Sequence, residues 1–318
     1  MTALALDTGI ARVRDRIGAV LSGKGIFIAL AVVLVVAAIV APNFYAQVNV
    51  SNTLRRASIL GLVTIGQLVV LMVRNVDLSV AAMIGITAVL LSTAHTTATG
   101  LVMALLLAVV VGAANTWLVV RRGVPAFVAT FGMVMVLQGG KLIWTQGSTS
   151  GESPAALVDL ARGSVGPVPT PFLLWLLVTI ALSVWISSTR SGRNVVVAGA
   201  NPTMARLSGI SVGKIQWLAF TGSAVLAVLA GALLTGFSGY VDRSIGTGYE
   251  LDSITAALLG GARFKGGEGS FVGAMGGVLV LAALDTLIVV LGLRPELQDV
   301  IKGVVLILAL TLHWPDRR

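Results

Sequence analysis

Few stretches of this sequence have the residue types and spacing that a catalytic or ligand-binding site needs. Residues 18–25, GAVLSGKG, come close to the phosphate-binding pattern GxxxxGK[ST]. In that pattern a Ser or Thr after the lysine ligates Mg²⁺, and the loop joins a strand to a helix. Gly25 stands where the hydroxyl should be, and no clear strand precedes Gly18. The segment therefore does not predict nucleotide binding by this chain.

Other catalytic and metal-binding sets are missing from the sequence as well. The chain contains no cysteine, which excludes disulfides, thiolate metal sites and cysteine nucleophiles. His95 and His313 stand alone near the ends of apolar runs, without partners at metal-ligand spacing. No Ser/His/Asp set and no pair of acids stands at a suggestive spacing. The sequence predicts no catalytic residue, no metal site and no cofactor bound by this chain.

Asp285 interrupts an apolar run, LAALDTLIVV, that is long enough to cross a bilayer. An acid at mid-bilayer depth costs roughly 2.5–3.5 kcal/mol on insertion scales, so it should face protein or water. Asp285 is either a polar point on a pathway or between subunits, or it hydrogen bonds to a Ser, Thr or Asn of a neighbouring helix. Asp77 begins another run, where Arg74 could pair with it. Uncharged polar residues that could line a weak path are Thr64, Gln67, Asn115, Thr130 and Gln138.

The elements that must position these residues are apolar helices. The 318 residues are 56% hydrophobic and only 11% charged, whereas soluble domains are about 25% charged. A helical span needs roughly 20 apolar residues. The run 251–262 is too short to cross alone and predicts a half-helix packed inside the bundle. We therefore expect an all-α polytopic membrane protein with about ten transmembrane helices, at 26–41, 57–73, 77–94, 100–120, 124–145, 171–189, 215–237, 251–262, 270–291 and 297–313.

The distribution of Lys and Arg predicts the orientation, since these residues favour cytoplasmic loops. With a cytoplasmic N-terminus, fifteen of the 22 basic residues fall in inner segments and six in outer ones, while Lys302 lies within a span. This predicts a cytoplasmic N-terminal segment, 1–25, a retained first span, and a single transmembrane domain, 26–313, with both termini in the cytoplasm. The net charge of +9 then reflects membrane orientation and not a nucleic-acid partner.

Two longer polar segments connect the spans. Residues 146–170 form a Gly/Ser/Pro-rich outer loop, and residues 190–214 form a basic inner loop. Asn201-Pro202 predicts a helix start, with Asn as the cap and Pro in the first turn. A short helix follows, which Gly209 can end. This helix either lies at the lipid headgroups or docks a soluble cytoplasmic partner.

A glycine-rich interruption separates the half-helix 251–262 from the next span. Small residues four apart on one face let helix backbones approach closely in lipid, and turn glycines permit a sharp return. The contact is either packing within the chain, which we favour, or a subunit interface. The glycines concerned are Gly260, Gly261, Gly266 and Gly267 in the turn and Gly269, Gly273 and Gly277 on the returning helix.

Four blocks, in order, carry a resemblance to a known family. GANPTMARLSGISVGKI, residues 199–215, resembles the cytoplasmic coupling segment of bacterial ABC-transporter permeases of the ribose/xylose/arabinose import type. The other blocks are NVDLSV (75–80), VPAFVAT (124–130) with TQGS (145–148), and GTGYELD (246–252) with LGG (259–261) and GGEG (266–269). The resemblance covers about residues 25 to 315. The sequence departs from the family pattern at Asn75 and Ala81, where glycines are usual, and at the bulkier, basic 263–265.

The resemblance implies the membrane-spanning subunit of an ATP-driven importer in a bacterial inner membrane, carrying a monosaccharide or similar small polyol. A second permease subunit, a copy or a sister chain, would complete the pathway. A cytoplasmic ATPase would bind ATP and Mg, and a periplasmic sugar-binding protein would deliver the cargo. This chain would not be an enzyme. By position, the residues implied for ATPase contact are Gly199, Asn201, Ala205, Arg206, Leu207, Ser208 and Gly209.

Two alternatives stay open. The same kind of importer could carry a branched-chain amino acid, a nucleoside or a furanosyl signal molecule. An ion-coupled secondary transporter is the other, but it would need acids at a coupling site, and Asp285 is the one good candidate.

Overall fold

The computed structural model describes residues 25–147, 151–242, 244–294 and 296–313. The predicted N-terminal segment and the imperfect phosphate loop lie outside these ranges, except Gly25. Every apolar run picked out in the sequence is a helix: α2 (Gly25–Val40), α3 (Gln47–Met72), α4 (Ser79–Thr93), α5 (Thr97–Thr116), α6 (Ala126–Trp144), α8 (Thr170–Ser188), α11 (Val212–Ser238), α12 (Tyr249–Leu259), α13 (Phe271–Val290) and α14 (Glu296–His313).

Six of these helices are long and apolar enough to cross a membrane, namely α3, α5 with its π-helical continuation η2 (Trp117–Arg121), α6, α8, α11 and α13. α2 and α4 are apolar but shorter, and α12 has only 11 residues. The prediction of an all-α, multi-spanning protein is therefore confirmed at this level. The count of ten crossings stays a prediction, because helix length alone does not fix it.

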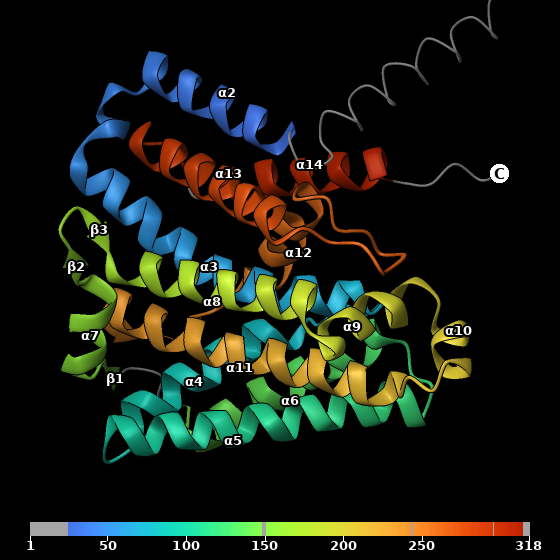
Figure 1. The fold of residues 1–318 in the computed structure, drawn as a ribbon. Helices are drawn as coiled ribbons and strands as arrows, with labels where there is room; N and C mark the ends of the chain where they lie inside the picture. The colour runs from blue at the N-terminus through green and yellow to red at the C-terminus, as the bar shows by residue number, and fades with distance from the viewer. Residues whose placement is uncertain (1–24, 148–150, 243, 295, 314–318) are drawn as a thin grey trace, which may run out of the picture.

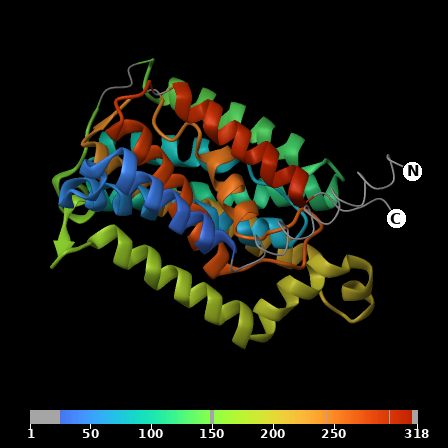
Figure 2. The same cartoon turned by 90° about the horizontal axis from the view of Figure 1, so that it is seen from above.

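The helices form a bundle in which α3 and α11 occupy the centre (Figures 1 and 2). α11 packs against α3, α4 and α5, and α13 packs against α3 and α12. The outer helices expose large apolar side chains, such as Ile39 on α2, Val110 on α5, Val136 on α6 and Leu177 on α8. A continuous apolar surface of this kind is stable only against lipid or another apolar partner.

One end of the bundle carries short connecting elements, which lie opposite α10 in Figure 1. The 146–170 segment, expected as a loop, contains α7 (Ala155–Arg162) and three two-residue strands, β1 (Gly151–Glu152), β2 (Ser164–Val165) and β3 (Val168–Pro169). β2 pairs with β3, and β1 pairs with β4 (Tyr240–Val241). The β1–β4 pair joins two segments that the sequence assigns to the same outer side.

At the same end of the bundle, the structure corrects the predicted start of one helix, α3. α3 begins after the 3₁₀ turn η1 (Pro42–Tyr45), ten residues before the predicted start of its apolar run. Arg55 and Arg56, expected in a loop, therefore lie within α3. Arg55 donates hydrogen bonds to the Arg162 carbonyl, at 2.7 Å, and to the Ser164 hydroxyl. The helix can extend here because both arginines reach the polar end of the bundle.

The opposite end carries α9 (Arg190–Ala200) and α10 (Pro202–Leu207), where a basic loop was expected. The Thr189 hydroxyl caps α9 by accepting from the Gly192 amide. The side-chain oxygen Oδ1 of Asn201 caps α10 by accepting from the Thr203 and Met204 amides, both at 3.1 Å. Gly209 follows at φ +79°. The helix predicted from Asn201-Pro202 is present, and α9 is an additional helix that the sequence did not indicate to us.

α12 and α13 form a helical hairpin whose backbones touch. A β-carbon at Gly273 would lie 2.0 Å from the Gly260 carbonyl oxygen, and one at Gly277 would lie 2.1 Å from that of Ala256. Gly261, Gly266 and Gly267 all have positive φ in the turn between the helices. Gly269, by contrast, faces the side chain of Leu68 on α3. The small residues on α13 thus serve a contact within this chain.

Candidate functional site

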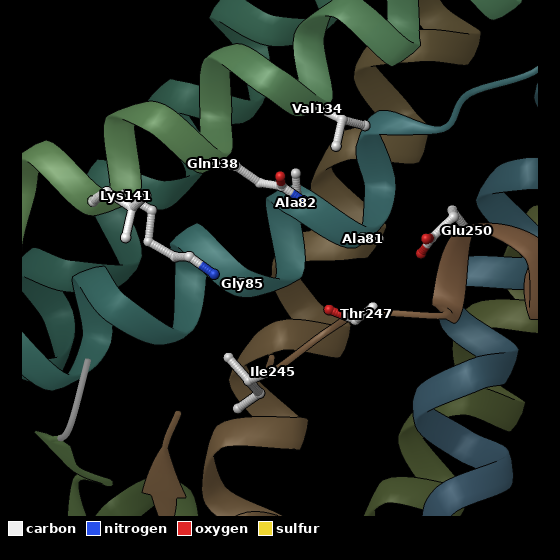
Figure 3. Close-up of a pocket in the computed structure, with 10 residues that line it drawn as sticks. Ala81, Ala82, Gly85, Val134, Gln138, Lys141, Ile245, Thr247 and Glu250 are labelled. Atoms are coloured by element: carbon white, nitrogen blue, oxygen red, sulfur yellow. The ribbon is translucent and has the colours of Figure 1, made fainter. Parts of the chain in front are cut away.

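A cavity of about 220 Å³ lies between α4, α6 and the segment that leads into α12 (Figure 3). Its volume is below the roughly 300–1,000 Å³ of drug-sized ligand pockets, so it suits a small molecule. α4 contributes Ala81, Ala82 and Gly85; α6 contributes Val134, Gln138, Lys141 and Leu142; and the third wall consists of Ile245, Thr247 and Glu250.

The polar groups of this cavity come from opposite sides (Figure 3). Lys141 and Gln138 extend from α6, while Thr247 and Glu250 lie on the other wall. Lys141 is only 8% exposed although it carries a charge. Glu250 accepts a hydrogen bond from the Gly248 amide at 2.9 Å, which fixes its position beside the cavity. One cation and one anion leave the wall neutral overall, with donors and acceptors for a polar ligand.

Gly85 keeps this space open at the point where α4 faces Lys141. A β-carbon there would lie 3.0 Å from the Ile245 carbonyl oxygen and 3.4 Å from the Lys141 amine. Gly246, at φ +90°, lets the third wall lie directly on α4, since a β-carbon would lie 2.7 Å from the Ala81 carbonyl oxygen. Gly246 of the 246–252 block therefore shapes one wall of the cavity.

The α9–α10 pair presents a second surface, at the other end of the bundle. Leu207 is 77% exposed and Met204 55% exposed, beside the exposed cation of Arg206. Asn201, Ser208 and Gly209 are exposed as well. The remaining two residues carried over from the family, Gly199 and Ala205, are buried. These two position the helices from inside, so they offer no side chain to a partner.

The end of α9 is fastened to two other segments. Arg74, which follows α3, donates from Nε to the Gly199 carbonyl and from Nη2 to the Ala200 carbonyl. The Gly267 amide, in the α12–α13 turn, donates to the Met72 carbonyl at 2.8 Å. A β-carbon at Gly199 would collide with the Met72 carbonyl oxygen. We call the contact of Met72–Arg74, Gly199–Ala200 and Gly266–Gly267 the three-segment junction.

With this geometry in place, comparison with known proteins identifies the family. Residues 49–310 match the model for "Branched-chain amino acid transport system / permease component". The chain belongs to this permease family. The resemblance drawn from its four sequence blocks is thereby confirmed, and the chain is a transport component and not an enzyme.

Individual relatives carry more specific names. The chain is 33% identical to the ribose import permease protein RbsC of Escherichia coli K12, over 89% of this chain and 90% of that protein. It is 30% identical to the RbsC of Bacillus subtilis, over 92% and 93% of the two chains. It is 33% identical to the autoinducer 2 import system permease protein LsrC of an Enterobacter species, over 80% and 76%. No solved structure gives a significant match.

In this permease the NVDLSV block is a buried break between α3 and α4. The Asp77 carboxylate accepts from the Ser79 amide, at 3.0 Å, and from the Ser79 hydroxyl. Asn115 donates to the Ser79 hydroxyl at 3.1 Å. In its corrected orientation the Gln67 amide bonds to both backbone groups of Asp77. These side chains replace the backbone partners that the interrupted helix lacks.

Four of the five uncharged polar residues suggested for a pathway form hydrogen bonds within the bundle and do not line the cavity. Gln67 and Asn115 hold the buried break, and Thr130 bonds to the Ala126 carbonyl on its own helix. Thr64 bonds to the Leu60 carbonyl on its own helix. Gln138 alone among the five lines the cavity. The suggested Arg74–Asp77 pair is wrong, because Arg74 turns outward to α9 while Asp77 turns inward to Ser79.

Asp285 has an ionic partner that neither sequence hypothesis included. The Lys302 amine lies 2.8 Å from Asp252 and 3.1 Å from Asp285, joining α14 to α12 and α13. All three side chains are less than one fifth exposed. The sequence marked Lys302 as lying inside a span but gave it no partner. Its charge was the signal that could have suggested this cluster.

The two charged residues of the cavity were also missed as lining residues. Lys141 is one of the six basic residues that the sequence assigned to outer segments, and Glu250 directly precedes the predicted half-helix, where a carboxylate complements the positive helix end. Lys141 instead belongs to the last turn of α6. Within the described part of the chain, no group of three His, Cys, Asp or Glu residues could hold a metal ion.

Proposed function

We propose that the chain is the membrane-spanning subunit of an ATP-driven importer and that its cargo is a monosaccharide or similar small polyol. The observation that carries this proposal is the small cavity of Figure 3, whose mainly apolar lining carries the polar side chains of Gln138, Lys141, Thr247 and Glu250. Ionisable groups at such depth are costly and typically line a ligand or ion pathway. A sugar offers hydroxyl donors and acceptors that Gln138, Thr247 and the charged pair can bind.

The relatives support this cargo class. Two are named ribose import permeases and cover nine tenths of the chain. A ribose-sized polyol also fits the cavity volume and its lack of net charge. A furanosyl signal molecule stays an alternative cargo, and one relative is named an autoinducer 2 import system permease.

An amino acid is the second candidate, because one observation favours it. Lys141 and Glu250 lie on opposite walls of the cavity and carry opposite charges. A zwitterion could place its carboxylate near the lysine and its ammonium group near the glutamate. The printed description of the family also refers to branched-chain amino acids.

Uptake by the reconstituted transporter distinguishes the two. The permease would be placed in liposomes with its partner ATPase and binding protein, and uptake of labelled ribose and leucine would be measured with ATP inside. We expect ribose uptake, and a loss of uptake in Gln138→Ala. Ser187→Ala, an exposed serine on α8, is the control and should leave uptake unchanged. Leucine uptake without ribose uptake would overturn the sugar assignment.

The partner proposal places the ATPase on the α9–α10 surface, which combines exposed apolar side chains with Arg206. ATP and Mg would be held by that partner. The binding protein would meet the opposite end, where α7 and the strands lie, and a second permease subunit would cover part of the apolar belt. This arrangement assigns both termini to the cytoplasm.

Co-purification tests the ATPase site. We expect the wild-type permease to co-elute with the ATPase and Arg206→Glu to lose most of the bound partner, because the substitution reverses the charge at the surface. Arg294→Glu makes the same charge change at an exposed residue outside α9–α10 and should retain the ATPase. Normal co-elution of Arg206→Glu would show that the partner binds elsewhere.

A further inference from the structure

The three-segment junction connects the α9–α10 pair, where the proposed function places the ATPase, to the cavity, where it places the cargo. On one side it holds the end of α9, through the two bonds from Arg74 to Gly199 and Ala200. Arg74 itself has φ +65°, a left-handed conformation that is uncommon for a residue with a side chain. Such a conformation persists only where surrounding contacts determine it. The guanidinium bonds to α9 are contacts of this kind.

Arg74 leads directly into the first wall of the cavity. Five residues beyond it Ser79 begins α4, and Ala81, Ala82 and Gly85 on the first two turns line the cavity. The intervening Asp77 is fully buried and bonded on several sides. The link is therefore short and stiff, so a displacement of Arg74 moves the start of α4 and is not absorbed by a flexible loop.

The third wall of the cavity, at residues 245–250, is connected to the same junction. Gly267 bonds to Met72 and lies against Ala200, where a β-carbon would come within 2.7 Å of the Ala200 backbone. The turn that contains Gly267 ends α12, and α12 carries Glu250 at its other end. Close backbone contact between α12 and α13 makes this hairpin one rigid unit. Two of the three walls of the cavity, those of α4 and of residues 245–250, are thus connected to residues that touch the last turn of α9.

We propose that Arg74 is the positioning residue that links the α9–α10 pair to two of the three walls of the cavity, so that ATPase-driven movement of the pair opens or closes the cargo site. The inference rests on the proposed docking of an ATPase at α9–α10. Arg74 contacts neither cargo nor nucleotide in this scheme. It holds the carbonyls at the end of α9 through two donors on one planar group, which gives the contact a fixed direction.

The test compares transport with ATP hydrolysis in the complete reconstituted complex. In Arg74→Ala we expect the ATPase to co-elute as with wild type and hydrolysis to persist. Cargo moved per ATP should fall about tenfold, within the range typical of coupling between two sites. Arg74→Lys retains the charge and one of the two bonds, so it should recover part of the loss. Arg263→Ala removes an exposed ion pair with Glu268 in the same turn and should match wild type.

A second measurement distinguishes transmission of movement through Arg74 from a purely structural role of this residue. The chain has no cysteine, so Thr247→Cys places a single thiol at the cavity wall. In the Thr247→Cys variant that retains Arg74, the rate at which the thiol reacts with a polar thiol reagent should change when ATP is added. In the double variant with Arg74→Ala, ATP should leave this rate unchanged. An unchanged transport-to-hydrolysis ratio in Arg74→Ala overturns the inference, and so does a parallel loss of ATPase binding. Failure of the wild-type permease to bind any ATPase would instead refute the proposed function.

Discussion

At the scale of single residues, the cluster around Lys302 shows how the fold accommodates charge within apolar helices. Two carboxylates, Asp252 and Asp285, share one ammonium group at 2.8 and 3.1 Å. Lys302 is the cation in direct contact with both acids, and without it each would be a largely buried charge with no ion-pair partner at contact distance. α14 has few other contacts with the bundle, mainly with α12 and α13. The cluster therefore fixes the place of α14.

Removing only the cation should be harmful. Lys302→Met leaves two buried carboxylates without a partner, so we expect it to lower the free energy of unfolding by roughly 3–5 kcal/mol. Denaturant titration of the purified protein in detergent measures this. The matched control replaces the whole cluster, Asp252→Asn with Asp285→Asn and Lys302→Met, and should recover most of the stability. Equal losses in the single and triple variants would show that charge pairing is not the cause.

At the scale of elements, the α12–α13 hairpin depends on glycine where the two backbones meet. Gly277→Ala would place a β-carbon 2.1 Å from the Ala256 carbonyl oxygen, so the helices must separate. Overpacking of this kind costs about 1–3 kcal/mol, and we expect a lower yield and a lower thermal unfolding midpoint. Gly222→Ala on α11 meets nothing within 4 Å and should be neutral or stabilising. A Gly277→Ala variant as stable as wild type would contradict the close contact.

α10 offers a milder test of a single cap. Asn201→Ala removes the acceptor for the Thr203 and Met204 amides, and lost caps cost about 1 kcal/mol. Because the docking surface must then be ordered by the partner, we expect ATPase affinity to fall about fivefold, measured by titration of purified components. Thr203→Ala leaves the backbone donor and the cap in place and is the control. Unchanged affinity for Asn201→Ala would mean that the partner does not depend on an ordered α10.

The elements that the sequence predicts well are those set by local composition. Each long apolar run became a helix because backbone groups in lipid must bond within their own segment. The start of α10 was predictable because Asn201 and Pro202 act within one turn. α7 and α9 were missed because they are short, with 8 and 11 residues, and lie within segments rich in Gly, Ser, Pro and charged residues. Their helices are stabilised by burial of one face, as at Val195 and Leu157.

The site was less predictable because it depends on contacts between distant residues. Asp285 and Lys302 meet from two different helices, α13 and α14, and Arg74 meets Gly199 across 125 positions. A sequence shows the charge but not its partner, so Arg74 was paired with its neighbour Asp77. Gln138 was found as a polar residue in an apolar run. Lys141 and Glu250 were not, because charges at helix ends are common for reasons unrelated to ligands.

At the scale of the whole molecule, each end of the bundle brings together segments that the sequence assigned to the same side of the membrane. Segments assigned outside meet through β1 and β4. Segments assigned inside meet at the three-segment junction, through Arg74 and Gly267. These contacts require that each group lie on one side of the membrane. They leave open which side is the cytoplasm, and that choice rests on the excess of Lys and Arg in one group.

Single-cysteine labelling decides the orientation, and the absence of natural cysteines makes it clean. Leu207 on α10 is 77% exposed, and Val165 in the β2–β3 hairpin is 65% exposed at the other end. With α9–α10 in the cytoplasm, an impermeant maleimide should label Val165→Cys in intact cells and leave Leu207→Cys unlabelled. In permeabilised cells both variants should be labelled. The unsubstituted chain should not be labelled in intact or in permeabilised cells. If intact cells label Leu207→Cys, the α9–α10 surface faces away from ATP, and neither the ATPase site nor the relay through Arg74 can operate as proposed.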